Sequence, residues 1–132
     1  MTAMAVFFVA RITGERKNMK KRPCAYISVS WSGNLFDDMD AADKACRLAY
    51  DAGLTPVCPI LEYRRYLRDD IPQEHKDMMD MAHEHLRRCS TLVVCGSTTD
   101  ETIMDDIAIA DRRGLTITSL DGIMIRKKNR HD

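Results

Sequence analysis

The feature that most constrains the fold is a regular alternation of short apolar runs with longer amphipathic segments. The short runs are rich in β-branched and aliphatic residues and predict strands at 24–29, 54–59, 91–95 and 115–119. The longer segments carry apolar residues at steps of three and four, which predicts helices at 35–52, 73–89 and 101–113. Strands that are apolar throughout and alternate with helices indicate a parallel sheet covered on both faces. We therefore predict an α/β fold, a three-layer flavodoxin- or Rossmann-like sandwich with four or five parallel strands.

Charge divides the chain into three parts. Residues 1–22 carry a net charge of +5 and residues 126–132 carry +3, so the part between them carries −8. We expect a flexible basic N-terminal extension (1–22), one folded domain (23–125) and a basic, frayed tail (126–132). The tails either add solubility or touch nucleic acid or a neighbouring subunit. Because the whole chain has 20 basic and 20 acidic residues, there is no strong indication of a nucleic-acid binder.

The five cysteines include no CxxC pair, so their spacing fits neither a disulfide framework nor a zinc site. All of them lie in apolar stretches, where cysteine behaves as a small hydrophobic residue, and we expect a cytoplasmic protein. No apolar run approaches the roughly 20 residues that a membrane-spanning helix needs, so we expect no membrane association.

Right-handed crossovers would bring the loops that follow the strands to one edge of the sheet, where we expect a ligand to bind. Small and polar residues before a helix suit a phosphate or a sugar hydroxyl, although the alternative is a solvated turn. No GxGxxG or Walker pattern is present. The candidate ligand-binding residues are Ser28, Ser30, Trp31, Gly33, Pro59, Gly96 and Ser97.

The third predicted helix carries an acid beside its apolar face. At about 100° per residue, Asp106 lies about 60° from Ile103, whereas Asp105 points about 160° away. An acid in this position is partly desolvated but is favoured by the helix dipole, and it can be aimed into a cleft. The alternative is a set of surface acids with Thr98 and Glu101 as a capping box.

Two further groups of polar residues lie near the predicted second and third strands. The pair His83 and His85 point about 200° apart on a helix, so they cannot share a metal ion, and we expect them at the surface or at the edge of the apolar stripe. Arg64, Arg65 and Arg68 would suit a phosphate or would cover the acidic body. We predict no metal and no cofactor.

A set of residues spread over positions 24–119 resembles a known family. These residues are Tyr26-Ile27-Ser28 in the first strand, Gly33, Pro59, Leu92-Val93-Val94, and the acid-Ile-x-x-Ala-x-x-x-Gly run from Asp106 to Gly114. Their order and spacing resemble the nucleoside 2-deoxyribosyltransferase-like family, and within it a branch of small uncharacterised domains.

The resemblance implies a reaction and roles for residues. Family enzymes cleave the N-glycosidic bond of a 2′-deoxynucleoside through a covalent deoxyribosyl-carboxylate. Asp106 occupies the place of the nucleophile, Asp100 that of an acid that binds sugar hydroxyls, and Tyr26 that of a tyrosine that hydrogen-bonds the nucleophile. The acid that handles the base matches Asp80 or Glu84.

The sequence thus predicts an N-glycosyl transferase or hydrolase that acts on a (deoxy)nucleoside or nucleotide through a carboxylate nucleophile. The alternative is a non-catalytic nucleotide-binding module of the same fold. The resemblance also implies a homodimer or a higher homo-oligomer, in which a second subunit completes the cleft.

Overall fold

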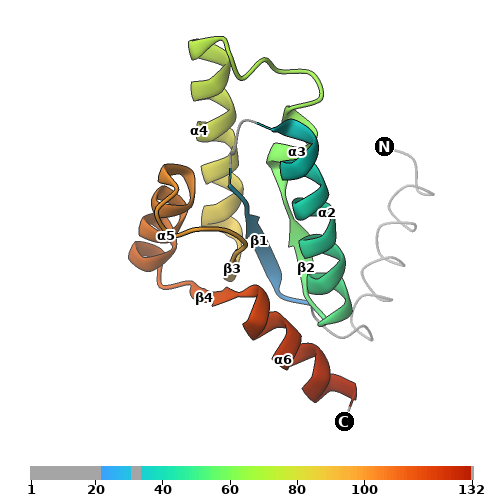
Figure 1. Cartoon of the computed structure of the whole chain (residues 1–132). Coiled ribbons are helices and arrows are strands. Elements are labelled where there is room, and N and C mark those ends of the chain that lie inside the picture. Colours follow the sequence, from blue (N-terminus) through green and yellow to red (C-terminus); the bar gives the residue numbers. More distant parts are fainter. Residues whose placement is uncertain (1–21, 31–33, 132) are drawn as a thin grey trace, which may run out of the picture.

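A four-stranded parallel sheet forms the centre of the computed structural model, which describes residues 22–30 and 34–131 (Figure 1). Its strands are β1 (Cys24–Ser28), β2 (Thr55–Val57), β3 (Thr91–Val94) and β4 (Thr116–Ser119). The order across the sheet is β2-β1-β3-β4, and every pair is parallel. This is the flavodoxin-like order, and the predicted α/β fold class is confirmed.

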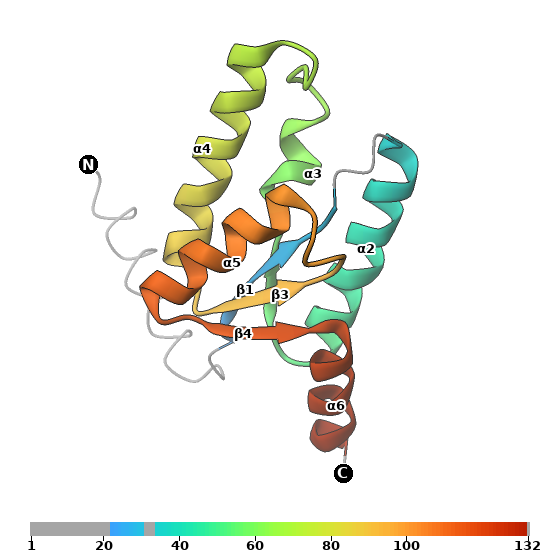
Figure 2. The same cartoon turned by 60° about the vertical axis from the view of Figure 1, so that its left-hand side comes forward.

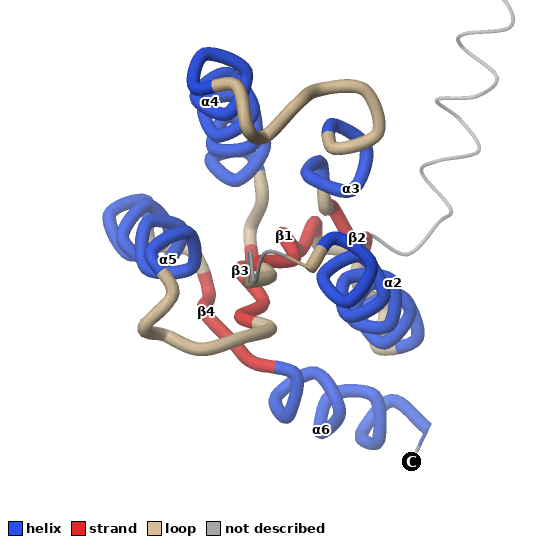
Figure 3. The backbone as a smooth tube through the Cα atoms, turned by 45° about the horizontal axis from the view of Figure 1, so that its top comes forward, coloured by secondary structure: helices blue, strands red, loops and turns tan. Residues whose placement is uncertain are grey.

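Helices cover both faces of the sheet, which gives three layers (Figure 3). The helices are α2 (Leu35–Asp51), α3 (Pro59–Tyr63), α4 (Pro72–Arg88), α5 (Glu101–Arg113) and α6 (Leu120–His131). Buried residues of α3, α4 and α5 pack with Tyr26 and Leu92 on one face. Buried residues of α2 and α6 pack with Ile27 and Val93 on the other. Figure 2 shows α5 lying across the sheet, with β4 at the sheet edge.

The central strand β1 supplies both cores because its side chains alternate between the two faces. Ala25 and Ile27 face α2, whereas Tyr26 faces α4 and α5. In the register with β3, Ile27 lies beside Val93 and Ser28 beside Val94. Ser28 is 1% exposed, so a polar side chain stands at the buried end of the central strand.

Local signals set the helix ends close to their predicted positions. The Asn34 side chain accepts a hydrogen bond from the Asp37 backbone N–H and begins α2. Gly114 ends α5 with a φ of 70°, in the left-handed region that favours glycine. Between β2 and α4 the structure has one short helix, α3, which begins at Pro59.

The expectation of a frayed tail from Arg126 is wrong, because helix α6 continues to His131. Ile123 of this helix is 1% exposed and belongs to the core on the α2 side. The Arg126 Nε donates to the Ala52 carbonyl oxygen at 2.9 Å, which attaches the basic segment to the end of α2. Except for Arg22, the expected N-terminal extension lies outside the described residues. None of the helices formed by residues 34–131 is long and apolar enough to cross a membrane.

Candidate functional site

The loops that follow β1 and β3 meet at the carboxyl edge of the sheet. Gly96 follows β3, and a Cβ atom placed on it would overlap the Ser30 hydroxyl and lie 2.8 Å from the Ile103 Cδ1 atom. A side chain at position 96 would therefore have to displace the Ser30 hydroxyl and the end of the Ile103 side chain. The structure brings Ser28, Ser30 and Gly96 to the same end of the sheet, where the sequence predicted a ligand.

Asp106 is buried beneath this edge and contacts residues from two other elements. Its side chain is 2% exposed. The Ser28 hydroxyl of β1 donates to Asp106 Oδ2 at 2.6 Å. On the other oxygen, His83 Nε2 of α4 lies 3.4 Å from Asp106 Oδ1. A strand and two helices thus place Ser28, Asp106 and His83 in one cluster, which we call the Asp106 site.

Helix periodicity explains how these side chains come to face one another. Asp106 comes three residues after the buried Ile103 and three before the buried Ile109, so it lies on the inner face of α5. His83 follows the buried Ala82 on α4, and its side chain is 17% exposed. Because α4 packs against α5, His83 at the edge of the apolar stripe of α4 meets Asp106 on the inner face of α5.

The order of the three groups limits what the Asp106 site can do chemically. In a serine hydrolase the histidine lies between the serine and the carboxylate, so that it can take the proton of the hydroxyl. Here the carboxylate lies between Ser28 and His83. The arrangement is therefore not a serine-hydrolase triad; it holds a buried carboxylate between a hydroxyl on one side and an imidazole on the other.

Tyr26 adds a fourth polar group on the same face of β1. It precedes Ser28 by two residues and is 1% exposed. Burial, together with the nearby charge of Asp106, raises the pKa of the Tyr26 phenol well above its ordinary value. The phenol therefore keeps its proton beside the carboxylate and remains a hydrogen-bond donor.

Asp100 begins α5 as its N-cap. Its Oδ1 atom accepts from the backbone N–H groups of Thr102 at 2.9 Å and Ile103 at 3.2 Å. The sequence offered Thr98 and Glu101 as a capping box, but Asp100 caps this helix. Its contacts fix the first turn of α5, and through it the position of Asp106 two turns into the helix.

The two candidate acids on α4 lie on its exposed side. The Asp80 side chain is 61% exposed and pairs with Lys76 at 2.8 Å, and Glu84 is 60% exposed and pairs with Arg87 at 2.9 Å. The hydrogen bond from Lys76 lowers the pKa of Asp80, and the nearby His83 contributes in the same direction. The structure therefore places His83, not Asp80 or Glu84, against Asp106.

His83 is the residue of the Asp106 site that sequence reasoning missed as a functional group. We expected it at the surface or at the edge of the apolar stripe, and the edge is where it lies. A usable signal was present, since His83 stands next to Ala82 and three residues before Leu86, both of which are buried. His85 of the same motif is exposed.

The structure gives the other predicted ligand-binding residues contacts of their own, none of them with Asp106 among the described residues. Ser97 is exposed, its hydroxyl lies 2.6 Å from that of Thr99, and it accepts from the Thr99 N–H at 3.2 Å. Pro59 is buried at the first turn of α3. Trp31 and Gly33 lie outside the described residues.

The arginines that follow β2 pair with carboxylates. Arg64 lies 3.4 Å from Asp38 of α2, and the two side chains are only 10% and 6% exposed. Arg68 pairs with Asp70 on the surface at 2.9 Å, and Arg65 is exposed. For Arg64 and Arg68 the structure thus shows the role of neutralising acidic groups. Among residues 22–30 and 34–131, no group of three or more His, Cys, Asp or Glu side chains is arranged to hold a metal ion.

The fold and the Asp106 site define a Rossmann-like α/β domain with a buried carboxylate at the carboxyl edge of its sheet. The sequence matches the family described as Domain of unknown function (DUF7768) over residues 23–120, and the chain belongs to this family. The matched region extends from the start of β1 to the first residue of α6, so it includes Ser28, His83 and Asp106. A search of curated proteins finds no match.

Proposed function

We propose that the protein is an N-glycosyl transferase or hydrolase that acts on a (deoxy)nucleoside or nucleotide, with Asp106 as its nucleophile. The observation that carries the proposal is the Asp106 carboxylate, buried at the ligand-binding edge of the fold and held between Ser28 and His83. The resemblance of the sequence to the nucleoside 2-deoxyribosyltransferase-like family supports the same reaction.

The proposed chemistry needs a carboxylate of this kind. When the base leaves, positive charge of oxocarbenium type develops on the anomeric carbon of the sugar. A carboxylate oxygen can stabilise this charge or trap the sugar as a covalent ester, which a second base or water then attacks. The hydrogen bond from Ser28 orients Asp106 Oδ2, so that the group is held in place before the reaction.

The leaving base must also receive a proton. We assign this task to His83, because Asp80 and Glu84 are engaged in ion pairs on the outer side of α4. An imidazole can donate a proton, and that of His83 already lies beside the Asp106 carboxylate. In this proposal Tyr26 stays neutral as a donor near Asp106, and Asp100 supports the sugar hydroxyls while it caps α5.

The ligand and the assembly follow from the same proposal. The loops around Ser30, Gly96 and Ser97 would contact the sugar or a phosphate, and the reaction needs no cofactor. A homodimer or a higher homo-oligomer would complete the cleft. Sedimentation velocity at micromolar concentration tests this point, and a sample that remains monomeric contradicts it.

One observation favours the second candidate, a non-catalytic nucleotide-binding module. Asp106 is almost fully buried, and both of its oxygens have polar neighbours. A carboxylate with these contacts also stabilises the packing of β1, α4 and α5, whether or not it reacts. The module would keep the ligand-binding edge and use Asp106 only to hold the three elements together.

The Asp106→Asn variant separates the two candidates, with Asp105→Asn as the matched control on the exposed side of the same helix. Each protein is incubated with a panel of 2′-deoxynucleosides and their 5′-monophosphates plus a second free base, and base exchange and release are followed by chromatography. We expect Asp106→Asn to abolish exchange but to keep ligand-induced thermal stabilisation, and Asp105→Asn to keep both. Stabilisation of the unmodified protein without exchange or base release establishes the binding module.

The assignment of the proton donor has its own test. His83→Gln should lower the rate of base release, and His85→Gln, an exposed neighbour on the same helix, should not. With substrates whose base leaves without protonation, His83→Gln should release the base as fast as the unmodified protein does. An equal loss with every substrate would mean that His83 acts only by holding Asp106.

A further inference from the structure

Strand β4 forms an edge of the sheet, and its outer backbone groups have no strand partner. It pairs with β3 on one side, and no strand in the described part of the chain lies on its other side. The Thr116 N–H donates to the Ser90 carbonyl oxygen at 3.1 Å, toward the start of β3. Because successive residues of a strand point their N–H and C=O groups to opposite sides, Ile117 and Ser119 direct theirs outward. Figure 2 shows this edge between α5 and α6.

The opposite edge strand, β2, is built differently. The Thr55 N–H donates to the Pro23 carbonyl oxygen at 2.8 Å, toward the start of β1, so the residue of β2 that faces outward is Pro56. Proline has no N–H, and on an edge strand it blocks pairing with a further strand. Strand β4, with the sequence TITS, contains no proline and no charged residue. The edge that can accept another strand is therefore that of β4.

The side chains of β4 make its edge self-complementary. Ile117 lies beside Leu92 in the register, so it faces the α5 side, and it is 41% exposed. Thr116 and Thr118 face the α6 side, where they line a hollow with Gly122. In an antiparallel pair of β4 strands with a two-fold axis at Ile117, the two isoleucines would cover each other on one face. On the other face, Thr116 would meet Thr118 of the partner subunit, a pairing that stabilises antiparallel strands.

Helix α5 adds an apolar side chain to the same edge. The Arg113 guanidinium donates to the Arg87 carbonyl oxygen of α4 at 3.5 Å, so this side of α5 faces α4. Met104 comes nine residues earlier, which at about 100° per residue places it on the opposite side of the helix. Because α4 packs over β1 and β4 lies beyond β3, this opposite side faces the β4 edge. Met104 is 52% exposed and, with Ile117, gives an apolar surface for a second copy to cover.

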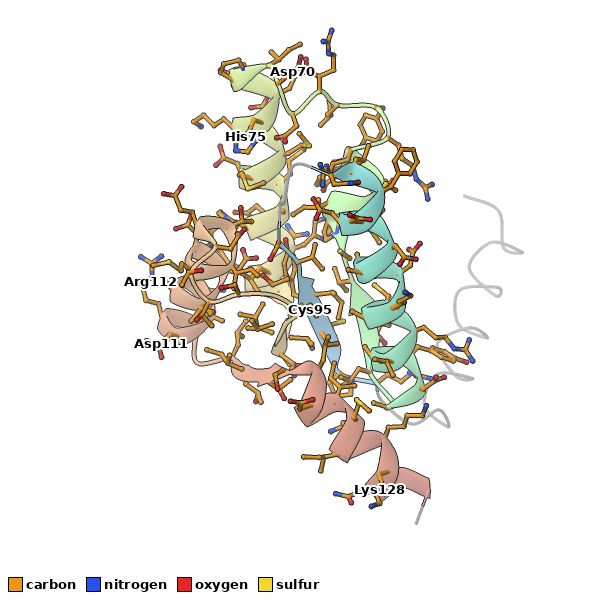
Figure 4. All side chains as sticks on the ribbon, in the orientation of Figure 1. Asp70, His75, Cys95, Asp111, Arg112 and Lys128 are labelled. Carbon is orange, nitrogen blue, oxygen red and sulfur yellow. The ribbon has the colours of Figure 1, made fainter. Side chains whose placement is uncertain are left out.

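Charges at the two ends of β4 favour an antiparallel pair. Before the strand, residues 111–113 carry two arginines and one aspartate, a net charge of +1, and after it Asp121 lies in the first turn of α6. Figure 4 shows Asp111 and Arg112 on the outer side of α5. An antiparallel pair places the positive start of each strand beside the negative end of the other, whereas a parallel pair places like ends together.

We propose that the protein is a homodimer in which two copies pair antiparallel along β4, so that two four-stranded sheets become one continuous sheet. The two Ile117 residues exchange N–H···O=C bonds across the axis, and the Ser119 N–H donates to the Leu115 carbonyl oxygen of the partner subunit. The two-fold axis closes the assembly at two chains. The inference rests on the assembly part of the proposed function, whose surface it names, and it does not depend on the glycosyl-transfer reaction.

Sedimentation velocity of the full-length protein at micromolar concentration tests the pairing. We expect the unmodified protein to sediment as a dimer of the 15.1 kDa chain. Ile117→Lys sets two like charges against each other at the axis and should give a monomer. Thr55→Lys, the same charge on the exposed start of β2, should remain a dimer. Circular dichroism verifies that both variants are folded.

The outcomes separate this pairing from the proposed assembly and from the reaction. A monomeric unmodified protein overturns both the pairing and the assembly. A dimer or higher oligomer that persists in Ile117→Lys overturns the pairing alone, because the subunits then meet through another surface. The base-release assay decides the reaction in either case.

The Ile117→Cys variant tests the register and does not rely on the lysine variant. Each introduced thiol lies opposite its own copy at the axis, and the Cα atoms of such a pair are about 5.5 Å apart, within the range of a disulfide. Mild oxidation should therefore give a covalent dimer linked at this position, and Thr55→Cys should give no such link. Peptide mapping distinguishes the bond from one made by the exposed Cys24. A folded dimer that forms no bond at position 117 overturns the pairing.

Discussion

Replacement of Ser28 by alanine tests whether the Asp106 site is a tightly coupled unit. The substitution removes one hydroxyl from a strand position that is 1% exposed and leaves Asp106 Oδ2 without its 2.6 Å donor. A hydrogen bond to a charged group contributes about 1.5–3 kcal/mol, and the loss is at the upper end when water cannot replace the donor. Since both residues are buried, we expect Ser28→Ala to lower the free energy of unfolding by about 2–3 kcal/mol.

Urea denaturation followed by circular dichroism measures this loss. For a chain of this length, 1 kcal/mol corresponds to about 4 °C in melting temperature, so the shift should be roughly 7–12 °C. Ser90→Ala is the matched control. The Ser90 hydroxyl likewise donates one hydrogen bond, but its acceptor is the neutral backbone carbonyl oxygen of Cys24 at 3.3 Å and the residue is exposed. We expect this control to change stability by less than about 0.5 kcal/mol.

A double-mutant cycle with Asp106→Asn makes the test specific. If the Ser28 hydroxyl acts through the negative charge of Asp106, its removal should matter less once the carboxylate is an amide, and the coupling free energy should be about 1 kcal/mol or more. The reasoning is refuted if Ser28→Ala is no more destabilising than Ser90→Ala, or if the two substitutions at the Asp106 site are additive.

Three further predictions concern the ion pair, a helix end and pH. Arg64→Met leaves the buried Asp38 without this partner and should destabilise the fold by about 2–4 kcal/mol, whereas Lys44→Met, which breaks an exposed pair with Asp40, should change it by less than about 0.5 kcal/mol in the same urea titration. Gly114→Ala forces a side chain into the left-handed region at φ 70° and should lower the melting temperature by a few degrees, a loss of about 1 kcal/mol in calorimetry. The pKa of Tyr26 is higher in the folded protein than in the unfolded chain, so the folded state keeps this proton longer and the free energy of unfolding should fall as pH rises above about 10. Tyr26→Phe should make that fall smaller, and an identical pH profile would contradict the cause given for the shift.

The local periodicity of apolar residues predicted the fold and the inward position of Asp106 in the candidate site. The periodicity of apolar residues predicted each strand and helix, because it depends only on neighbours in the sequence. The alternation of these apolar strands with helices then predicted the parallel sheet. The three-residue spacing between Ile103 and Asp106 placed this acid on the inner face of its helix. Right-handed crossovers then brought the loop after β1 to the loop after β3, where Gly96 approaches Ser30.

The partner of Asp106 depended on packing between elements. Periodicity put His83 at the edge of a stripe, but only the contact of α4 with α5 turns that edge toward the carboxylate and leaves Asp80 on the outer side. Sequence by itself determined the four strands, the helices α2, α4 and α5 and the inner face of α5, since local backbone geometry fixes those properties. It did not predict helix α6, which packs Ile123 into the core on the α2 side. Which inward side chains meet was decided by the tertiary structure, because that depends on how separate helices dock on the sheet.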